Sequence, residues 1–92
     1  MAIQKTISLE YKGETIVSQP FKFRQACLVD DERYRGGGLA TGARTALISM
    51  FDGTKITEEI VENGEIDIKT LRKAVDRVID MFLGIDEEVK NS

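Results

Sequence analysis

Few residues of this chain could perform catalysis. The 92 residues include no His, no Trp and a single Cys, Cys27. His is the commonest general acid or base, and a nucleophilic Ser or Cys usually needs a neighbouring base to activate it. No spacing of Cys, Asp and Glu forms a metal-binding motif. We therefore expect no catalytic residue, cofactor or metal ion, and a protein that acts by binding instead of as an enzyme.

Two segments share features with sites that bind phosphate or nucleic acid. Three glycines at 36–38 precede a helical pattern, but the Gly-Lys-Ser/Thr ending of a phosphate-binding loop is absent. Arg33, Tyr34 and Arg35 combine an aromatic ring with cations, as single-strand binding sites do. A flexible connector and a helix end are the simpler interpretations. The net charge of −3 also argues against nucleic acid and anionic membranes as partners.

Acidic and aromatic clusters are the remaining candidates for binding. The acidic runs at 30–32 and 86–88 lack the alternating spacing of a calcium loop, so they are interpreted as solvated charges. Phe21 and Phe23 either pack in the core or, where exposed, anchor a protein partner. The candidate partner-binding residues are Phe21, Phe23, Tyr34, Leu39, Met50 and Phe51.

The N-terminal part of the chain has the pattern of a β-hairpin. Ile3, Ile7, Leu9 and Tyr11 alternate with polar residues, which is typical of a half-buried strand. A turn at 12–13 and a second strand from 14 to 18 complete a hairpin over 3–18. Residues 24–35 fit either a strand or a helix, and the charges at 30–33 favour a helix. Cys27 lies in an apolar run and is expected to be buried.

Helical spacing continues to residue 84. One helix is predicted from Leu39 to about residue 50, and a short one follows with Thr54 or Thr57 as its N-cap. The clearest helix begins after Asp67 and ends near Gly84. Its predicted core-facing residues are Ile68, Leu71, Val75, Val78, Ile79 and Phe82.

These patterns predict one α+β domain over residues 1–92. An N-terminal β-hairpin at 3–18 packs against three to four α-helices in a helical region at 21–84, and a frayed acidic tail follows at 85–92. The N-terminus lacks the pattern of a signal peptide, and no apolar run approaches the length of a membrane span. We therefore expect a cytoplasmic location.

The order of elements also suggests a family. A hairpin around ISLEYKGE at 7–14 leads into FKFRQACLVDDE at 21–32, and helices follow from 39 to 83. This order, in a chain of this size, resembles that of the tail assembly chaperones of long-tailed bacteriophages (siphophages) and prophages. The resemblance implies a non-enzymatic protein that coats the tape measure protein and promotes tail tube assembly. It also implies self-association into an oligomer in the cytoplasm of the bacterial host, and absence from the mature virion.

The same resemblance implies a second product of the gene. Members of this family are often made in two lengths by ribosomal frameshifting, and the longer form would give contact with the tail tube protein. Lys90 and Asn91 can be encoded by codons that form a slippery heptamer, although the amino acids alone leave this open. A small regulatory or antitoxin-type protein-binding module is the alternative function.

Overall fold

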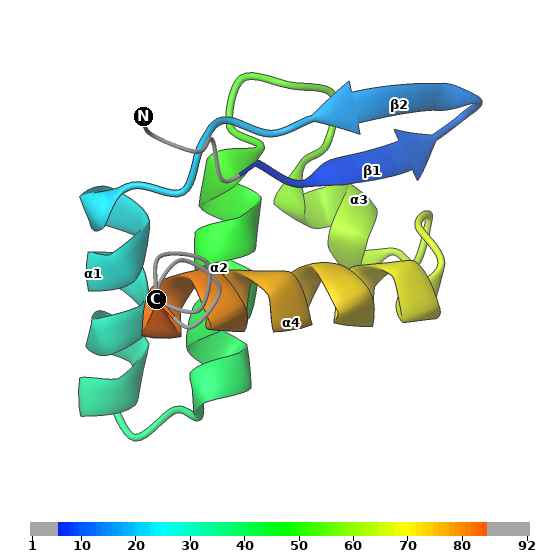
Figure 1. Ribbon diagram of the computed structural model, residues 1–92. Helices are drawn as coiled ribbons and strands as arrows, with labels where there is room; N and C mark the ends of the chain where they lie inside the picture. The colour runs from blue at the N-terminus through cyan, green and yellow to red at the C-terminus, as the bar shows by residue number, and fades with distance from the viewer. Residues whose placement is uncertain (1–5, 85–92) are drawn as a thin grey trace.

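A computed structural model describes residues 6–84, so the predictions for residues 3–5 and for the tail at 85–92 lie outside the described residues. A two-stranded hairpin is followed by helices (Figure 1). The elements are β1 (Ser8–Tyr11), β2 (Glu14–Val17), α1 (Phe23–Tyr34), α2 (Leu39–Met50), α3 (Glu58–Glu62) and α4 (Ile68–Leu83). This arrangement confirms the predicted α+β class, with a hairpin preceding four helices in the described range.

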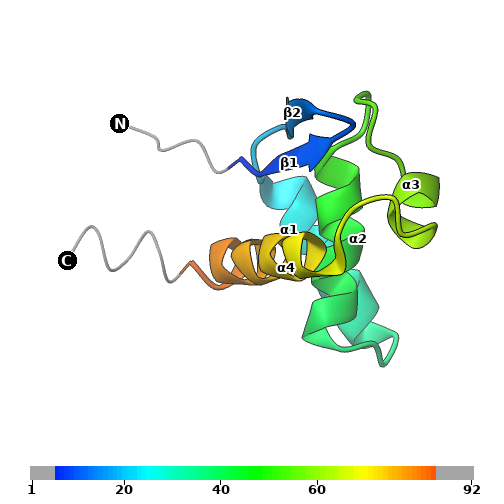
Figure 2. The same ribbon diagram turned by 90° about the vertical axis from the view of Figure 1, so that its right-hand side faces the viewer.

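A tight turn closes the hairpin. Lys12 and Gly13 have φ angles of 52° and 79°, the left-handed pair that a two-residue hairpin turn requires. Leu9 pairs with Ile16, and the pairing continues past the strands because the Ser18 amide donates to the Ile7 carbonyl at 2.8 Å. Ile7, which precedes β1, and Leu9 of β1 are buried in the core, and the hairpin lies above α4 in both views (Figures 1 and 2).

Polar contacts hold the turn end of the hairpin to distant loops. The Tyr11 hydroxyl donates a hydrogen bond to Glu65 Oε1 at 2.8 Å, just before α4. Lys55 belongs to the segment between α2 and α3, and its Nζ lies 2.7 Å from Oε2 of Glu14 in β2. The carboxylate of Glu65 raises the pKa of Tyr11, because it accepts a hydrogen bond from the neutral phenol and repels the phenolate.

Residues 23–34 form a helix, which settles the choice that the sequence left open. The side chain of Gln25 accepts from the Lys22 amide at 2.9 Å and donates to Ser49 Oγ of α2 at 3.1 Å. Val29, one turn later, is completely buried. One side of α1 is therefore fixed against α2.

The closest approach of the two helices occurs at Gly42. A Cβ atom at this position would lie 2.8 Å from the carbonyl oxygen of Val29 and 3.0 Å from its Cα. Real Cβ atoms do not come this close to backbone, so only glycine permits this separation. Ala43 and Ala46, which are both fully buried, continue the small-residue surface of α2.

Helix α4 crosses α2 and closes the core (Figure 1). Asp67 caps it by accepting from the Lys69 amide at 3.1 Å and the Thr70 amide at 3.3 Å, and Gly84 ends it with φ of 71°. Both ends match the sequence prediction. The buried apolar residues are Ile7, Leu9, Val29, Ala43, Ala46, Leu47, Met50, Phe51, Ile56, Ile66, Ala74, Val78 and Met81.

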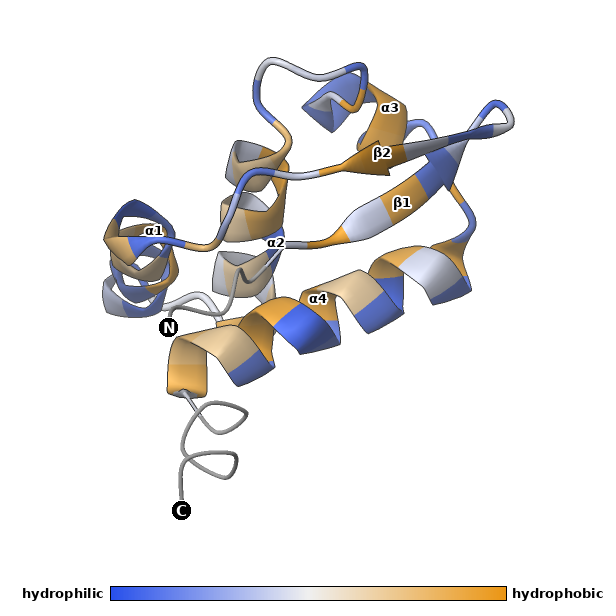
Figure 3. Cartoon of the chain, turned by 45° about the horizontal axis from the view of Figure 1, so that its top comes forward, coloured by the Kyte–Doolittle hydropathy of each residue, from blue (hydrophilic) through white to orange (hydrophobic). Residues whose placement is uncertain are grey.

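Two predicted core residues lie at the surface. Cys27 is exposed because the side of α1 that meets α2 carries Gln25 and Val29, and Cys27 projects away from it. Ile68 is 67% exposed because the first turn of α4 extends past α2 (Figure 1). The hydrophobic colour that follows α4 in Figure 3 therefore marks a stripe that the core covers only in part.

Replacing Gly42 with Ala should destabilise the fold. Helix propensity alone favours Ala over Gly by about 1 kcal/mol. The clash with Val29 opposes this gain, and we expect the free energy of unfolding in urea to fall by about 1–2 kcal/mol. Thr41→Ala, at an exposed position of the same helix, should leave it unchanged or raise it slightly. Stabilisation by Gly42→Ala would contradict the close approach.

Removing the Glu65 carboxylate should lower the pKa of Tyr11. In a Tyr34→Phe background only Tyr11 titrates, since the chain has two tyrosines. Adding Glu65→Gln removes the negative charge that opposes ionisation of Tyr11 and leaves a neutral amide oxygen, a weaker acceptor, in place of the carboxylate. Alkaline titration followed by ultraviolet absorbance should then show a midpoint at lower pH than in the single variant. Identical midpoints would show that Glu65 does not hold the hydroxyl in solution.

Candidate binding site

The structure separates the six predicted partner-binding residues. Phe23 and Tyr34 stand at the two ends of α1 and are 83% and 90% exposed. Phe21 and Leu39 are half-buried and pack against the edge of the core. These four residues therefore do not form one patch.

Met50 and Phe51 must be withdrawn from the candidate surface. Both are 0% exposed, and they lie where α2 ends beneath the hairpin. Gln19, which follows β2, donates its amide to the Met50 carbonyl at 2.9 Å. Their apolar side chains serve the core, so neither can touch a partner in this structure.

A groove lies between α2, α3 and α4. Its volume is about 600 Å³, within the range of about 300–1,000 Å³ typical of ligand sites. Apolar side chains from all three helices form its floor. They are Leu47, Ile48, Val61, Ile68, Leu71 and Val75.

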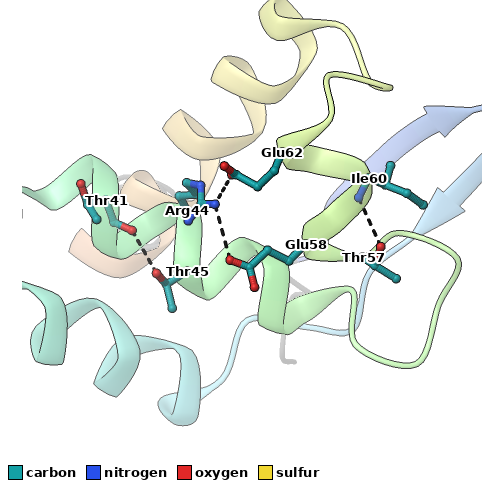
Figure 4. Close-up of polar contacts among 7 residues, drawn as sticks. All are labelled: Thr41, Arg44, Thr45, Thr57, Glu58, Ile60 and Glu62. Carbon is teal, nitrogen blue, oxygen red and sulfur yellow. Dashed lines mark hydrogen bonds and ion pairs between the residues drawn. The ribbon is translucent and has the colours of Figure 1, made fainter.

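Charged side chains line the rim of this groove. Arg44 on α2 makes ion pairs with Glu62 and, at 3.7 Å, with Glu58 on α3 (Figure 4). On the opposite side, Arg72 and Asp76 of α4 line the groove. The rim therefore carries both signs of charge, and the apolar floor between them has the character of a site for an amphipathic peptide.

Helix α3 forms one wall of the groove, although it has no fully buried residue. Its N-cap is Thr57, whose hydroxyl accepts from the Ile60 amide at 3.3 Å (Figure 4). Ile60 and Val61 pack against the core in half-buried positions, and Arg44 supplies the charged contact to α2. The position of this wall thus depends on a few contacts at the protein surface.

Sequence reasoning did not find the groove. Its floor residues Ile68, Leu71 and Val75 were assigned to the core because they follow a helical stripe. A signal was nevertheless present. The apolar residues of α4 occupy a stripe wider than one helix contact needs, and Ala74 and Met81 fill its other side.

No three His, Cys, Asp or Glu side chains of the described chain come together as metal ligands. None of its helices is both long and apolar enough to cross a membrane. What the groove offers chemically is apolar contact at its floor and ion pairs at its rim.

Comparisons with known proteins add no further constraint. No protein-family model matches the chain, and neither a curated protein nor a solved structure is similar to it.

Replacing Arg44 with Gln should loosen α3. We expect the free energy of unfolding at low salt to fall by about 0.5–1 kcal/mol, because two partly exposed ion pairs are lost. High salt should reduce the difference, since it screens such pairs. Arg72→Gln is the matched control, because Arg72 lies on the same rim and makes no ion pair with the described residues. An equal, salt-independent loss in both variants would contradict this role.

Proposed function

We propose that this protein is a non-enzymatic phage tail assembly chaperone that holds apolar helical segments of the tape measure protein in the groove between α2, α3 and α4. The observation that carries the proposal is an apolar floor left open on a folded domain. Ile68 in particular is 67% exposed at the edge of this groove. Large apolar residues in an open concavity are typical of surfaces that receive a partner.

The chemistry of the groove fits a helical client. An amphipathic helix inserts side chains at i, i+3, i+4 and i+7 into an apolar groove. Leu71 and Val75, one turn apart on α4, line the groove together with Leu47 and Ile48 of α2 and offer apolar contacts for such side chains. The rim charges at Arg72 and Asp76 are placed to pair with polar residues on the flanks of the client helix.

Chaperone action would follow from reversible shielding. A long helical protein that waits for assembly exposes apolar stripes that would otherwise aggregate. A domain that covers such a stripe through one shallow groove binds each segment weakly, and many copies along one client bind more strongly together. The proposal therefore needs moderate affinity for several segments of the client.

The direct test is binding to tape measure peptides. Overlapping peptides from the tape measure protein encoded in the same genome are titrated with the chain, and anisotropy reports binding. We expect several predicted amphipathic segments to bind. Ile68→Asp should weaken binding at least tenfold, because it places a charge at the apolar edge of the groove.

Leu83→Asp is the matched control. Leu83 lies on the same helix, is 48% exposed and does not line the groove, so its replacement should leave peptide affinity unchanged. Equal weakening by both substitutions would contradict the groove as the binding site. Failure of all tape measure peptides to bind would refute the function, and a single stoichiometric protein partner would then favour a regulatory or antitoxin-type module.

A further inference from the structure

The outer face of α1 carries large side chains that no described residue covers. Phe23 and Tyr34 are 83% and 90% exposed, and Cys27 between them is exposed as well. With Asp30 they follow the spacing i, i+4, i+7 and i+11, which places all four on one face of the helix. We call these residues the α1 stripe.

The α1 stripe lies opposite the contact with α2. Gln25 and Val29 are the buried residues of α1, and both face α2. Helix α1 lies at the outer edge of the fold, with α2 beside it on one side only (Figures 1 and 3). The stripe is therefore separate from the groove, whose lining residues belong to α2, α3 and α4.

The α1 stripe is complementary to itself when two helices run antiparallel. Phe23 and Tyr34 lie at equal distances from a midpoint between residues 28 and 29, about 8 Å to either side along the helix. Cys27 and Asp30 share the same midpoint. A two-fold axis through this point places Phe23 of one copy against the partner's Tyr34, and the reverse contact forms at the other end.

The charges beside the α1 stripe fit the same axis. Arg24 and Asp31 are seven residues apart, so both flank the stripe on the same side, and both are exposed. In the antiparallel pair, Arg24 and the partner's Asp31 are offset by only about 3 Å along the axis. Neither makes an ion pair within the described part of the chain. The two-fold axis repeats this pair, so one dimer gains two ion pairs.

From this symmetry we infer that the outer face of α1 is the contact surface for a second copy of this chain, paired antiparallel about the midpoint of the helix. A different partner would not require aromatic residues and opposite charges to be placed symmetrically about nearly the same point. Residues 22–35 carry four basic and three acidic side chains, so no large net charge opposes the pairing. A single helix pair buries a small area, which gives a weak dimer at high concentration.

Charge reversal tests the pairing. Arg24→Glu and Asp31→Arg should each weaken dimerisation at least tenfold in sedimentation equilibrium, because each puts like charges together twice. The double variant R24E/D31R should restore the wild-type dissociation constant. Lys69→Glu, an exposed charge reversal on the first turn of α4, should leave it unchanged. Single-variant losses that the double variant does not recover would overturn the antiparallel geometry.

Cys27 reports the geometry independently. The two Cys27 residues of an antiparallel pair are offset by about 4.5 Å along the axis, within reach of a short bismaleimide linker. We expect rapid formation of cross-linked dimer, which Tyr34→Asp should slow at least tenfold. The same linker applied to C27S/E59C, which moves the thiol to an exposed site on α3, should give no dimer above random collision. A monomeric chain at millimolar concentration would overturn the inference, and peptide binding in the groove would remain unaffected.

Discussion

The fold depends on how closely α1 approaches α2. At Gly42 the backbone of α2 touches Val29, and this contact buries Val29 completely. A side chain larger than hydrogen would push α1 outward and open the core between Val29 and Ala46. The bond from Gln25 to Ser49 fixes the register of the same pair one turn away. Because α1 occupies one side of α2 at short distance, the other side remains for α4 and for the hairpin that closes over both.

The two candidate interaction surfaces follow from this arrangement. Helix α4 packs against α2 and buries Ala74, Val78 and Met81, whereas Leu71 and Val75 line the open groove beside α3. Helix α1 packs mainly against α2, and the face that carries Phe23, Cys27 and Tyr34 is exposed. The surfaces use different helices. Under the two proposals made above, a client and a second copy therefore occupy different helices and do not compete.

The sequence predicts elements better than it predicts surfaces. The turn at Lys12 and Gly13, the cap at Asp67 and the end at Gly84 are local, and each follows from backbone chemistry that a few residues determine. Whether a side chain is buried depends instead on which helix or strand packs against it in the fold. Cys27 and Ile68 are apolar whether they are buried or exposed, so their type does not reveal that both lie at the surface. Met50 likewise gives no local signal that it is covered. The position of the groove depends on where helices end relative to one another, which the local pattern does not give. The sequence indicates Phe23 and Tyr34 as candidates for partner contact, but not that Met50 and Phe51 belong to the core instead.

The lack of buried residues in α3 gives the domain two levels of stability. Local unfolding of this helix exposes only half-buried Ile60 and Val61, whereas global unfolding exposes the whole core. We therefore expect the amides of α3 to exchange faster than those of α2, and to exchange faster still at high ionic strength, which screens the ion pair of Arg44 with Glu62. A groove with one such wall adapts its width to side chains of different size. For the proposed chaperone function, such a groove favours chemically varied helices over tight affinity for any one of them.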